Sequence, residues 1–255
     1  MRNRTRERIA SGDAAIGTMS MLGDPNAVEA MGHAGLDFVF LDMEHTERDM
    51  SGMLPLIRAA NLTGMTPFVR IPGLDLAQIQ RALDAGAEGI VVPGIRSAEQ
   101  ARTLARACAF PPRGTRGTCR YSRSAAAGKY AESWPAFVEN ADAEILSMAL
   151  VEDPDGVQEL EGIVEAVDIV LVGRGDLSTA LGVPGQVTHP SVLEAIKRYE
   201  DAAMRQRKPL ATMCYTVEEA RDALARGYRY LMYGADVNVL YREYSSAVTA
   251  LRAGR

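Results

Sequence analysis

The chain has 255 residues, of which 47% are apolar and 24% charged, and its formal net charge at pH 7 is −5. This composition is near the globular average, which argues against disorder, and the acidic balance gives no electrostatic reason to bind nucleic acid or an anionic membrane. No apolar run is long enough for a membrane span and the first residues lack the apolar core of a signal peptide, so we expect a cytoplasmic protein.

The three cysteines, Cys108, Cys119 and Cys214, lie far apart and never form a CxxC pair. An odd and scattered set argues against a disulfide framework and against a zinc knuckle. We therefore expect free thiols in a reducing compartment.

A strand–helix unit repeats along the chain. Its first strand is predicted over residues 14–19 and its first helix over residues 25–35, where Asp24 is a candidate N-cap and Pro25 suits the first helical position. Apolar runs predict further strands over residues 37–41, 66–71, 89–92, 145–151, 168–172, 209–213 and 230–233. Helical spacing predicts the alternating helices over residues 50–60, 76–85, 98–107, 191–205, 217–226 and 237–251.

Glycines mark the ends of several of these helices. Gly35, Gly64, Gly86 and Gly227 each follow a helical stretch and precede a strand, where a left-handed residue is favoured. Eight strands that are apolar on both faces and alternate with helices imply a parallel sheet covered on both sides. We therefore predict an α/β protein whose residues 1–255 form a single (β/α)8 TIM barrel, in preference to an open doubly wound sheet.

One long connection, at about residues 110–142, interrupts the repeat. It contains Pro111 and Pro112, and a helix is expected around Trp134. Long connections inside compact domains are uncommon and often functional. We expect this one to fold over the site as a lid or to reach a neighbouring subunit.

The same connection carries four arginines, Arg113, Arg116, Arg120 and Arg123. Such a cluster would suit an acidic or phosphorylated acceptor substrate. Solvated charges or intersubunit salt bridges explain it at least as well.

Ionisable side chains follow several predicted strands, and in a parallel barrel the reacting groups gather at the carboxyl ends of the strands. Asp42, Glu44 and His45 follow the second strand. Asp42 is close enough in sequence to orient the His45 imidazole and support its protonated form. Arg70 ends the third strand, where a buried charge needs an anionic partner, either a substrate oxyanion or one of the rim acids.

Two further acids follow predicted strands: Glu152 follows the fifth strand and Asp176 follows the sixth. Completed by waters and an oxygen-rich substrate, such a pair suits a hard divalent cation such as Mg2+ or Mn2+, although barrel rims also carry structural carboxylates. The turn Gly173-Arg174-Gly175 opens a helical pattern and would present backbone N–H groups to a carboxylate or phosphate. The alternative is a plain turn in which Asp176 is the N-cap.

Six motifs, taken together and in this order, resemble the HpcH/HpaI family of metal-dependent class II pyruvate aldolases. They are Leu41-Asp42-Met43-Glu44-His45, Phe68-Val69-Arg70-Ile71-Pro72, Val91-Val92-Pro93, Phe110-Pro111-Pro112-Arg113-Gly114-Thr115-Arg116-Gly117, Val151-Glu152 and Gly173-Arg174-Gly175-Asp176-Leu177-Ser178. The resemblance covers nearly the whole chain.

The resemblance implies a barrel whose C-terminal helix is exchanged between protomers, with dimers assembled into a hexamer as a trimer of dimers. It implies a divalent metal (Mg2+, Mn2+ or Co2+) bound by Glu152 and Asp176. The turn of Gly173, Arg174 and Gly175 would hold the pyruvate carboxylate.

On the same resemblance, His45 oriented by Asp42 is the acid/base on the aldol hydroxyl, and Arg70 stabilises the enolate oxygen. Glu44 would be an acid of the surrounding water network rather than a direct metal ligand. Asp84 matches a family acid near the subunit boundary.

The chain departs from the family pattern at the pyruvate end of the pocket. Leu150 replaces a glutamine, Arg174-Gly175 replaces proline and alanine, and Met19 replaces an aromatic residue. We expect a carbon–carbon lyase that cleaves a 4-hydroxy-2-oxo acid to pyruvate, or a related 2-oxo acid, and an aldehyde. The alternatives are a biosynthetic condensing enzyme of the same family, some of which need no metal, and a non-catalytic barrel that serves as an assembly partner.

Overall fold

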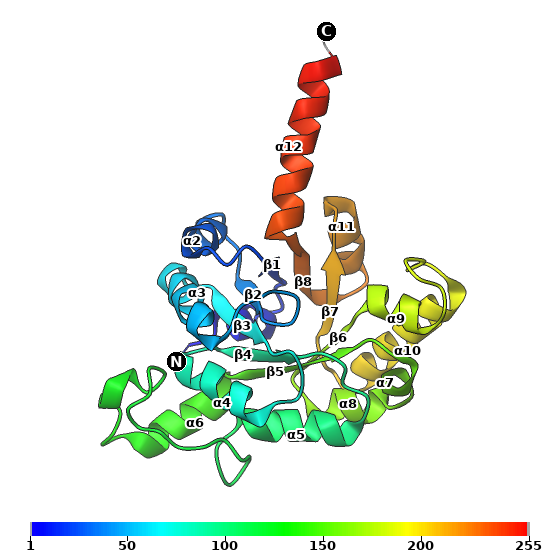
Figure 1. Cartoon of the computed structure of the whole chain (residues 1–255). Coiled ribbons are helices and arrows are strands. Elements are labelled where there is room, and N and C mark those ends of the chain that lie inside the picture. Colours follow the sequence, from blue (N-terminus) through cyan, green and yellow to red (C-terminus); the bar gives the residue numbers. More distant parts are fainter. Residues whose placement is uncertain (1, 254–255) are drawn as a thin grey trace.

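A computed structural model describes residues 2–253, and the eight strands found there close into a parallel barrel in chain order (Figure 1). The predicted barrel is therefore confirmed, with each strand within a few residues of its expected position. The strands are β1 (Ala15–Ser20), β2 (Phe38–Asp42), β3 (Thr66–Arg70), β4 (Gly89–Val92), β5 (Leu146–Val151), β6 (Ile169–Val172), β7 (Leu210–Cys214) and β8 (Tyr228–Ala235).

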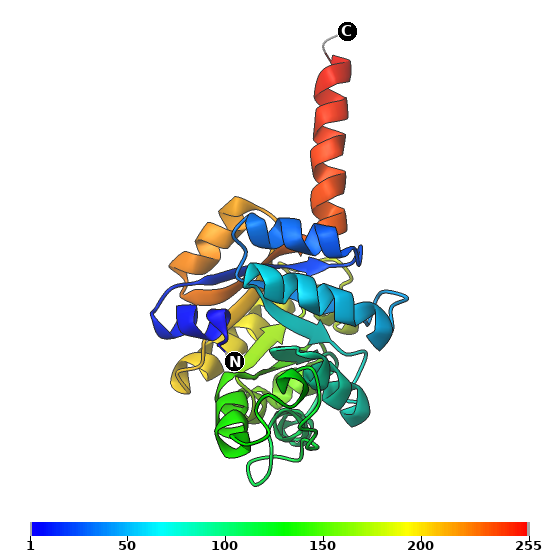
Figure 2. The same cartoon turned by 90° about the vertical axis from the view of Figure 1, so that its left-hand side faces the viewer.

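Among the described residues the chain forms helices, most of which surround the barrel and cover the outer faces of its strands, whereas the last one projects away from it (Figures 1 and 2). They are α1 (Arg4–Ala10), α2 (Pro25–His33), α3 (Met50–Thr63), α4 (Leu76–Ala85), α5 (Ala98–Cys108), α6 (Trp134–Glu144), α7 (Pro154–Gln158), α8 (Leu160–Ala166), α9 (Arg174–Ala180), α10 (Pro190–Arg205), α11 (Val217–Ala225) and α12 (Asp236–Ala253). Within the described residues, no helix is both long and apolar enough to cross a bilayer.

The predicted helix ends have the expected chemistry. Asp24 caps α2 by accepting hydrogen bonds from the backbone N–H groups of Asn26 and Ala27. Gly64 and Gly86 end α3 and α4 in the left-handed region, with φ of 78° and 97°. These caps reverse the chain toward the next strand, so local sequence sets the repeat of the barrel.

Aromatic side chains fill the interior of the barrel. The Phe38 and Phe68 rings lie 5.7 Å apart between centroids, and the Phe40 and Phe68 rings lie 5.2 Å apart. All three side chains are at most 2% exposed. Because they close the middle of the barrel, any ligand site must lie at one of its two ends.

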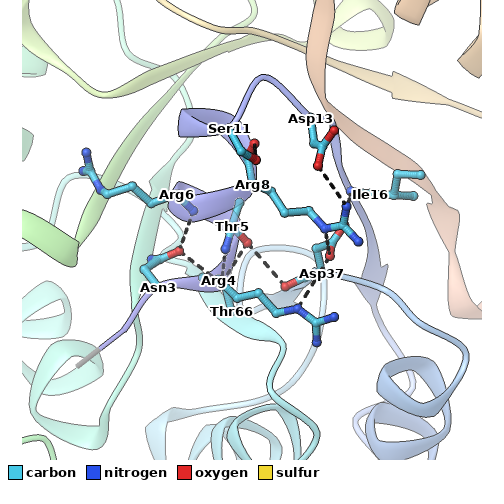
Figure 3. Close-up of polar contacts among 10 residues, drawn as sticks. All are labelled: Asn3, Arg4, Thr5, Arg6, Arg8, Ser11, Asp13, Ile16, Asp37 and Thr66. Atoms are coloured by element: carbon cyan, nitrogen blue, oxygen red, sulfur yellow. Dashed lines mark hydrogen bonds and ion pairs between the residues drawn. The ribbon is translucent and has the colours of Figure 1, made fainter.

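Helix α1 covers the amino-terminal end of the barrel (Figure 3). The Thr5 hydroxyl donates to the Thr66 hydroxyl at 2.8 Å, and Arg8 Nε donates to the buried Asp37 carboxylate at 2.7 Å. Asp37 and Thr66 stand at the starts of β2 and β3. With this end occupied, the carboxyl ends of the strands are left for a site.

The long connection between α5 and β5 also lies toward the amino-terminal end. Arg123 donates to the Ala85 carbonyl at 2.8 Å and to Asn61 Oδ1 at 3.1 Å, and these acceptors stand at the carboxyl-terminal ends of α4 and α3. The Phe110, Trp134 and Phe137 rings pack together and anchor the segment. The expected lid over the site of the same chain is therefore wrong, because these contacts hold the connection away from the carboxyl-terminal rim. The alternative, that the connection reaches a neighbouring subunit, stays a prediction.

Glu88, directly before β4, should make the stability of the protein depend on pH. Burial raises the pKa of Glu88 to about 7, whereas an unfolded glutamate titrates near 4.3. Between these values the folded state binds more protons than the unfolded state, so its stability falls as pH rises. We expect the free energy of unfolding of Glu88→Gln to exceed that of the unchanged protein by about 3–4 kcal/mol at pH 8 and to equal it at pH 4.

Urea unfolding of both proteins at each pH measures this difference. Glutamine keeps an oxygen that can accept the hydrogen bond donated by Asn61 Nδ2, so the variant changes little besides the charge. A difference between the two proteins that is constant from pH 4 to pH 8 would contradict the assignment.

Candidate active site

A cavity of about 420 Å³ lies at the carboxyl-terminal end of the barrel. Phe40 and Val91 from the barrel interior line it, together with Arg70 from the end of β3 and Asp176 from α9. Its size is in the range of pockets that bind small organic ligands. The predicted site residues that line this space are Arg70, Gly173, Arg174, Gly175 and Asp176, whereas Asp42, Glu44, His45 and Glu152 do not line it.

Arg70 is held by two carboxylates. Asp42 and Arg70 are partners in the β2–β3 register, and Arg70 Nε and Nη2 each donate to a different Asp42 oxygen at 2.8 Å. Arg70 Nη1 lies 2.9 Å from Glu44 Oε2. Burial would raise the pKa of Asp42, but the hydrogen bonds and charge of Arg70 outweigh it and lower that pKa. We expected the partner of Arg70 to be either a substrate oxyanion or a rim acid, and the structure shows rim acids in this role.

Asp42 acts on His45 through the main chain rather than through the ring. Its carboxylate accepts from the backbone N–H groups of Glu44 at 2.9 Å and His45 at 3.3 Å. The expectation that Asp42 orients the imidazole is therefore corrected, because both oxygens are engaged by Arg70 and by these amides. The acid beside the ring is Glu44, whose Oε2 lies 3.7 Å from His45 Nε2, and the His45 side chain is 60% exposed.

Three carboxylates influence one another at this rim, those of Glu44, Glu152 and Asp176. Burial, together with the charges of Glu44 and Asp176, raises the pKa of Glu152 to about 7. Burial also raises the pKa of Glu44, against the lowering effect of Arg70 and His45. Glu152 Oε1 accepts from the Gly94 backbone N–H at 2.8 Å, which fixes its direction.

The donor set fits a hard divalent cation. Carboxylate oxygens are the ligands that Mg2+ and Mn2+ prefer, and mutual repulsion among acids is relieved by a bound cation. Within residues 2–253, no three side chains of His, Cys, Asp or Glu form a complete metal cage. A pair such as Glu152 and Asp176 would therefore leave the remaining positions to water and substrate.

The turn after β6 packs tightly on Glu152. Helix α9 starts at Arg174 with Gly173 as its N-cap residue, so the alternative in which Asp176 is the N-cap is wrong. A Cβ atom on Gly173 would lie 3.1 Å from Glu152 Cβ and 3.2 Å from Glu152 Oε2. Glycine at this position lets the turn approach the carboxylate.

We therefore expect Gly173→Ala to displace the Glu152 carboxylate by a few tenths of an ångström and to lower turnover about tenfold, since small misplacements at a reacting centre are costly. Gly73→Ala, in the loop after β3, is the matched control, because a Cβ there meets nothing within 4 Å. Steady-state kinetics of the two variants provide the comparison. Equal turnover in both variants would argue that Glu152 takes no part in the reaction.

The arginines of the long connection and Asp84 do not line this cavity. Arg116 is 2% exposed, lies 3.3 Å from Asp84 and covers the Phe110 ring. Arg120 lies over the Trp134 ring, 5.7 Å from its centroid. These contacts do not support the expectation that the arginines of this connection bind an acidic acceptor in the same chain.

Three polar cavity residues were not predicted from the sequence: Thr188, Tyr215 and Glu219. Tyr215 directly follows β7, so extending the strand-end rule to that strand would have found it. Thr188 lies between α9 and α10 and Glu219 lies in α11, and neither position has a local signal. The three departures from the family pattern, Met19, Leu150 and Arg174, also line the cavity.

A model of the HpcH/HpaI aldolase/citrate lyase family matches residues 16–242. The chain belongs to this family. It is 34% identical to a hydroxypyruvate/pyruvate aldolase of Pseudomonas aeruginosa, over 99% of this chain and 94% of the relative. This relative and two others, from Pseudomonas putida and Shigella dysenteriae, are named aldolases, which makes this family member a carbon–carbon lyase.

Two solved structures are similar over nearly the whole chain. An HpcH/HpaI aldolase/citrate lyase family protein from Burkholderia cenocepacia J2315 has a TM-score of 0.91 and 31% identity, and the match covers 98% of this chain and 99% of that one. The citrate synthase SbnG has a TM-score of 0.90 and 25% identity, with 99% of each chain covered.

Proposed function

We propose that the enzyme reversibly cleaves a 4-hydroxy-2-oxo acid into pyruvate, or a related 2-oxo acid, and an aldehyde. The main support is the arrangement of Arg70, fixed by Asp42 at the wall of the cavity, beside the acids Glu44, Glu152 and Asp176. It offers positive charge to an enolate and acid/base groups to the hydroxyl. The name of the Pseudomonas aeruginosa relative supports the same class of substrate.

In this proposal His45 takes the proton from the hydroxyl of the 4-hydroxy-2-oxo acid as the bond between C3 and C4 breaks. The electron pair of that bond passes to the 2-oxo oxygen, and the aldehyde leaves. Arg70 stabilises the enolate oxygen, and because Asp42 fixes the guanidinium beforehand, little reorganisation is needed. A proton returned to C3 then gives the 2-oxo acid.

We further propose that Glu152 and Asp176 hold a divalent cation, Mg2+, Mn2+ or Co2+. When bound, such an ion supplies Lewis-acid polarisation of the substrate oxygens. Backbone groups of Gly173, Arg174 and Gly175 are proposed to bind the substrate carboxylate.

The function is tested by incubating the enzyme with a panel of 4-hydroxy-2-oxo acids and each of the three metal ions. A coupled assay measures the release of pyruvate. We expect metal-stimulated release from at least one panel member. Absence of release from every member with every metal, by folded protein, would count against the cleavage reaction.

A condensing enzyme is the second candidate, favoured by Leu150 and Arg174 at the cavity and by the similarity to citrate synthase SbnG. Calorimetric titration with metal and pyruvate separates the two proposals. A metal site in the presence of pyruvate supports the aldolase, and its absence supports the condensing enzyme.

We also propose that residues 1–255 act as one domain and that α12 packs on a second copy of the chain in a hexamer. Helix α12 projects away from the barrel (Figures 1 and 2), and its Tyr241, Tyr244 and Leu251 side chains are 69–77% exposed. Light scattering should give a mass six times the 27.5 kDa of the chain. The place of Asp84 at a subunit boundary, the cytoplasmic location and the absence of nucleic-acid or membrane partners stay predictions.

A further inference from the structure

Arg174 is a cation at the cavity wall without an anionic partner in the described part of the chain. Its Nη2 donates to the Met213 backbone carbonyl at 2.8 Å, and its other nitrogens make no hydrogen bond to residues 2–253. Arg70 differs, because the Asp42 and Glu44 carboxylates lie within 2.9 Å of it. The charge of Arg70 is thus balanced by the protein, whereas that of Arg174 is free to meet a ligand.

Arg174 and Arg70 lie on opposite sides of the cavity. Arg70 ends β3, and the Arg174 side chain is tied to Met213 on β7. The eight strands close in chain order, so β3 and β7, four strands apart, face each other across the barrel. The Arg174 side chain therefore stands across the cavity from the guanidinium that we assign to the enolate and reaches toward β7, whereas the backbone of its turn is left for the carboxylate of the 2-oxo acid.

The cavity has room for a second substrate group between these two walls. Its volume of about 420 Å³ lies within the range of pockets that enclose drug-sized ligands, which is more than a 2-oxo acid alone occupies. Tyr215 and Thr188 line the cavity along with Arg174. The Glu219 carboxylate, which also lines it, accepts the Tyr215 backbone N–H at 2.7 Å and makes no ion pair with Arg174 among the described residues.

We infer that Arg174 determines specificity by binding an anionic group at the end of the aldehyde remote from its carbonyl. The enzyme would thus prefer aldehydes that carry a carboxylate over neutral aldehydes of the same shape. This inference rests on the proposed aldol reaction. A guanidinium suits the role because it stays charged and its planar donors match a carboxylate. The bond to Met213 holds it in place before the substrate arrives.

The experiment compares condensation of pyruvate with ω-oxo carboxylates of increasing chain length and with the corresponding neutral primary amides, in the presence of Mn2+. For the unchanged enzyme we expect a higher kcat/KM with the carboxylate at one chain length. Arg174→Gln, which can still donate to the Met213 carbonyl, should lower the ratio of kcat/KM for acid over amide tenfold or more. Arg174→Lys should restore part of the ratio, because it returns the charge.

Arg102→Gln is the matched control, because it removes an exposed positive charge from α5, away from the cavity. It should leave the ratio unchanged. An equal loss with acid and amide in Arg174→Gln would overturn the inference, and so would a preference of the unchanged enzyme for amides at every chain length. The KM for pyruvate can also be measured by deuterium exchange in the absence of any aldehyde. If Arg174→Gln raises this KM by the same factor by which it lowers kcat/KM with the acid, Arg174 binds the 2-oxo acid and not the aldehyde.

These outcomes are distinct from a failure of the proposed function. If the unchanged enzyme exchanges the C3 protons of pyruvate, the aldol chemistry stands and only the selectivity is in question. If it neither exchanges pyruvate nor condenses it with any aldehyde, the proposed function fails and the inference fails with it.

Discussion

Replacing Arg70 by alanine is expected to lower kcat for cleavage of a 4-hydroxy-2-oxo acid by about 10²–10³-fold, the usual cost of removing one preorganised donor to a developing oxyanion. The guanidinium is buried and oriented by two 2.8 Å hydrogen bonds to Asp42. Arg70→Lys should recover little of the lost activity, because an ammonium group cannot make both bonds in the same plane.

The Arg70 variants need a control for folding, since Arg70→Ala leaves the buried Asp42 without its counter-ion, a change that costs roughly 3–5 kcal/mol of stability. Asp42→Asn provides a second approach, because it keeps the shape of the side chain and removes its charge. If Asp42 works by positioning Arg70, the variant that carries both Asp42→Asn and Arg70→Ala should have the same kcat as Arg70→Ala alone. Full activity in folded Arg70→Ala would contradict the role of Arg70.

Glu152→Gln and Asp176→Asn are each expected to abolish metal-stimulated turnover and to weaken Mn2+ binding by more than the roughly 10- to 100-fold that loss of a supporting residue costs. The amides keep the size of the side chains but remove the charge that a hard cation requires. Calorimetry measures the binding directly, so the result does not depend on finding the substrate.

Asp153→Asn is the matched control for these two variants. Asp153 follows Glu152 but caps α7 by accepting the Gly156 backbone N–H at 2.9 Å, and asparagine is an equally good N-cap. This variant should bind Mn2+ as the unchanged enzyme does. Normal Mn2+ affinity in both Glu152→Gln and Asp176→Asn would remove the proposed metal site.

The barrel could be predicted from the sequence because its signals are local. Short apolar runs such as Phe38–Asp42 and side-chain caps such as Asp24 depend on residues close together in the chain. The family resemblance rested on motifs that are also local, five of them at strand ends and one, residues 110–117, in the long connection after α5. Boundaries were less accurate, and β8 extends from Tyr228 to Ala235 where four residues were expected.

The parts that could not be predicted depend on packing between distant segments. Asp42 was assigned to His45 because they are three residues apart, whereas the strand register places Asp42 opposite Arg70. The long connection was expected to be a lid because of its length, but its direction is set by contacts of Arg123 with the ends of α3 and α4. No local pattern contains either piece of information.

The most direct test of whether this site forms an enolate is the exchange of the C3 protons of pyruvate with deuterium, monitored by NMR. The unchanged enzyme should catalyse exchange when Mg2+, Mn2+ or Co2+ is present, and folded Arg70→Ala should be slower by about the same 10²–10³-fold as in cleavage. Folded enzyme that gives no exchange above the metal ion alone, with any of the three ions, would contradict the proposed aldolase chemistry.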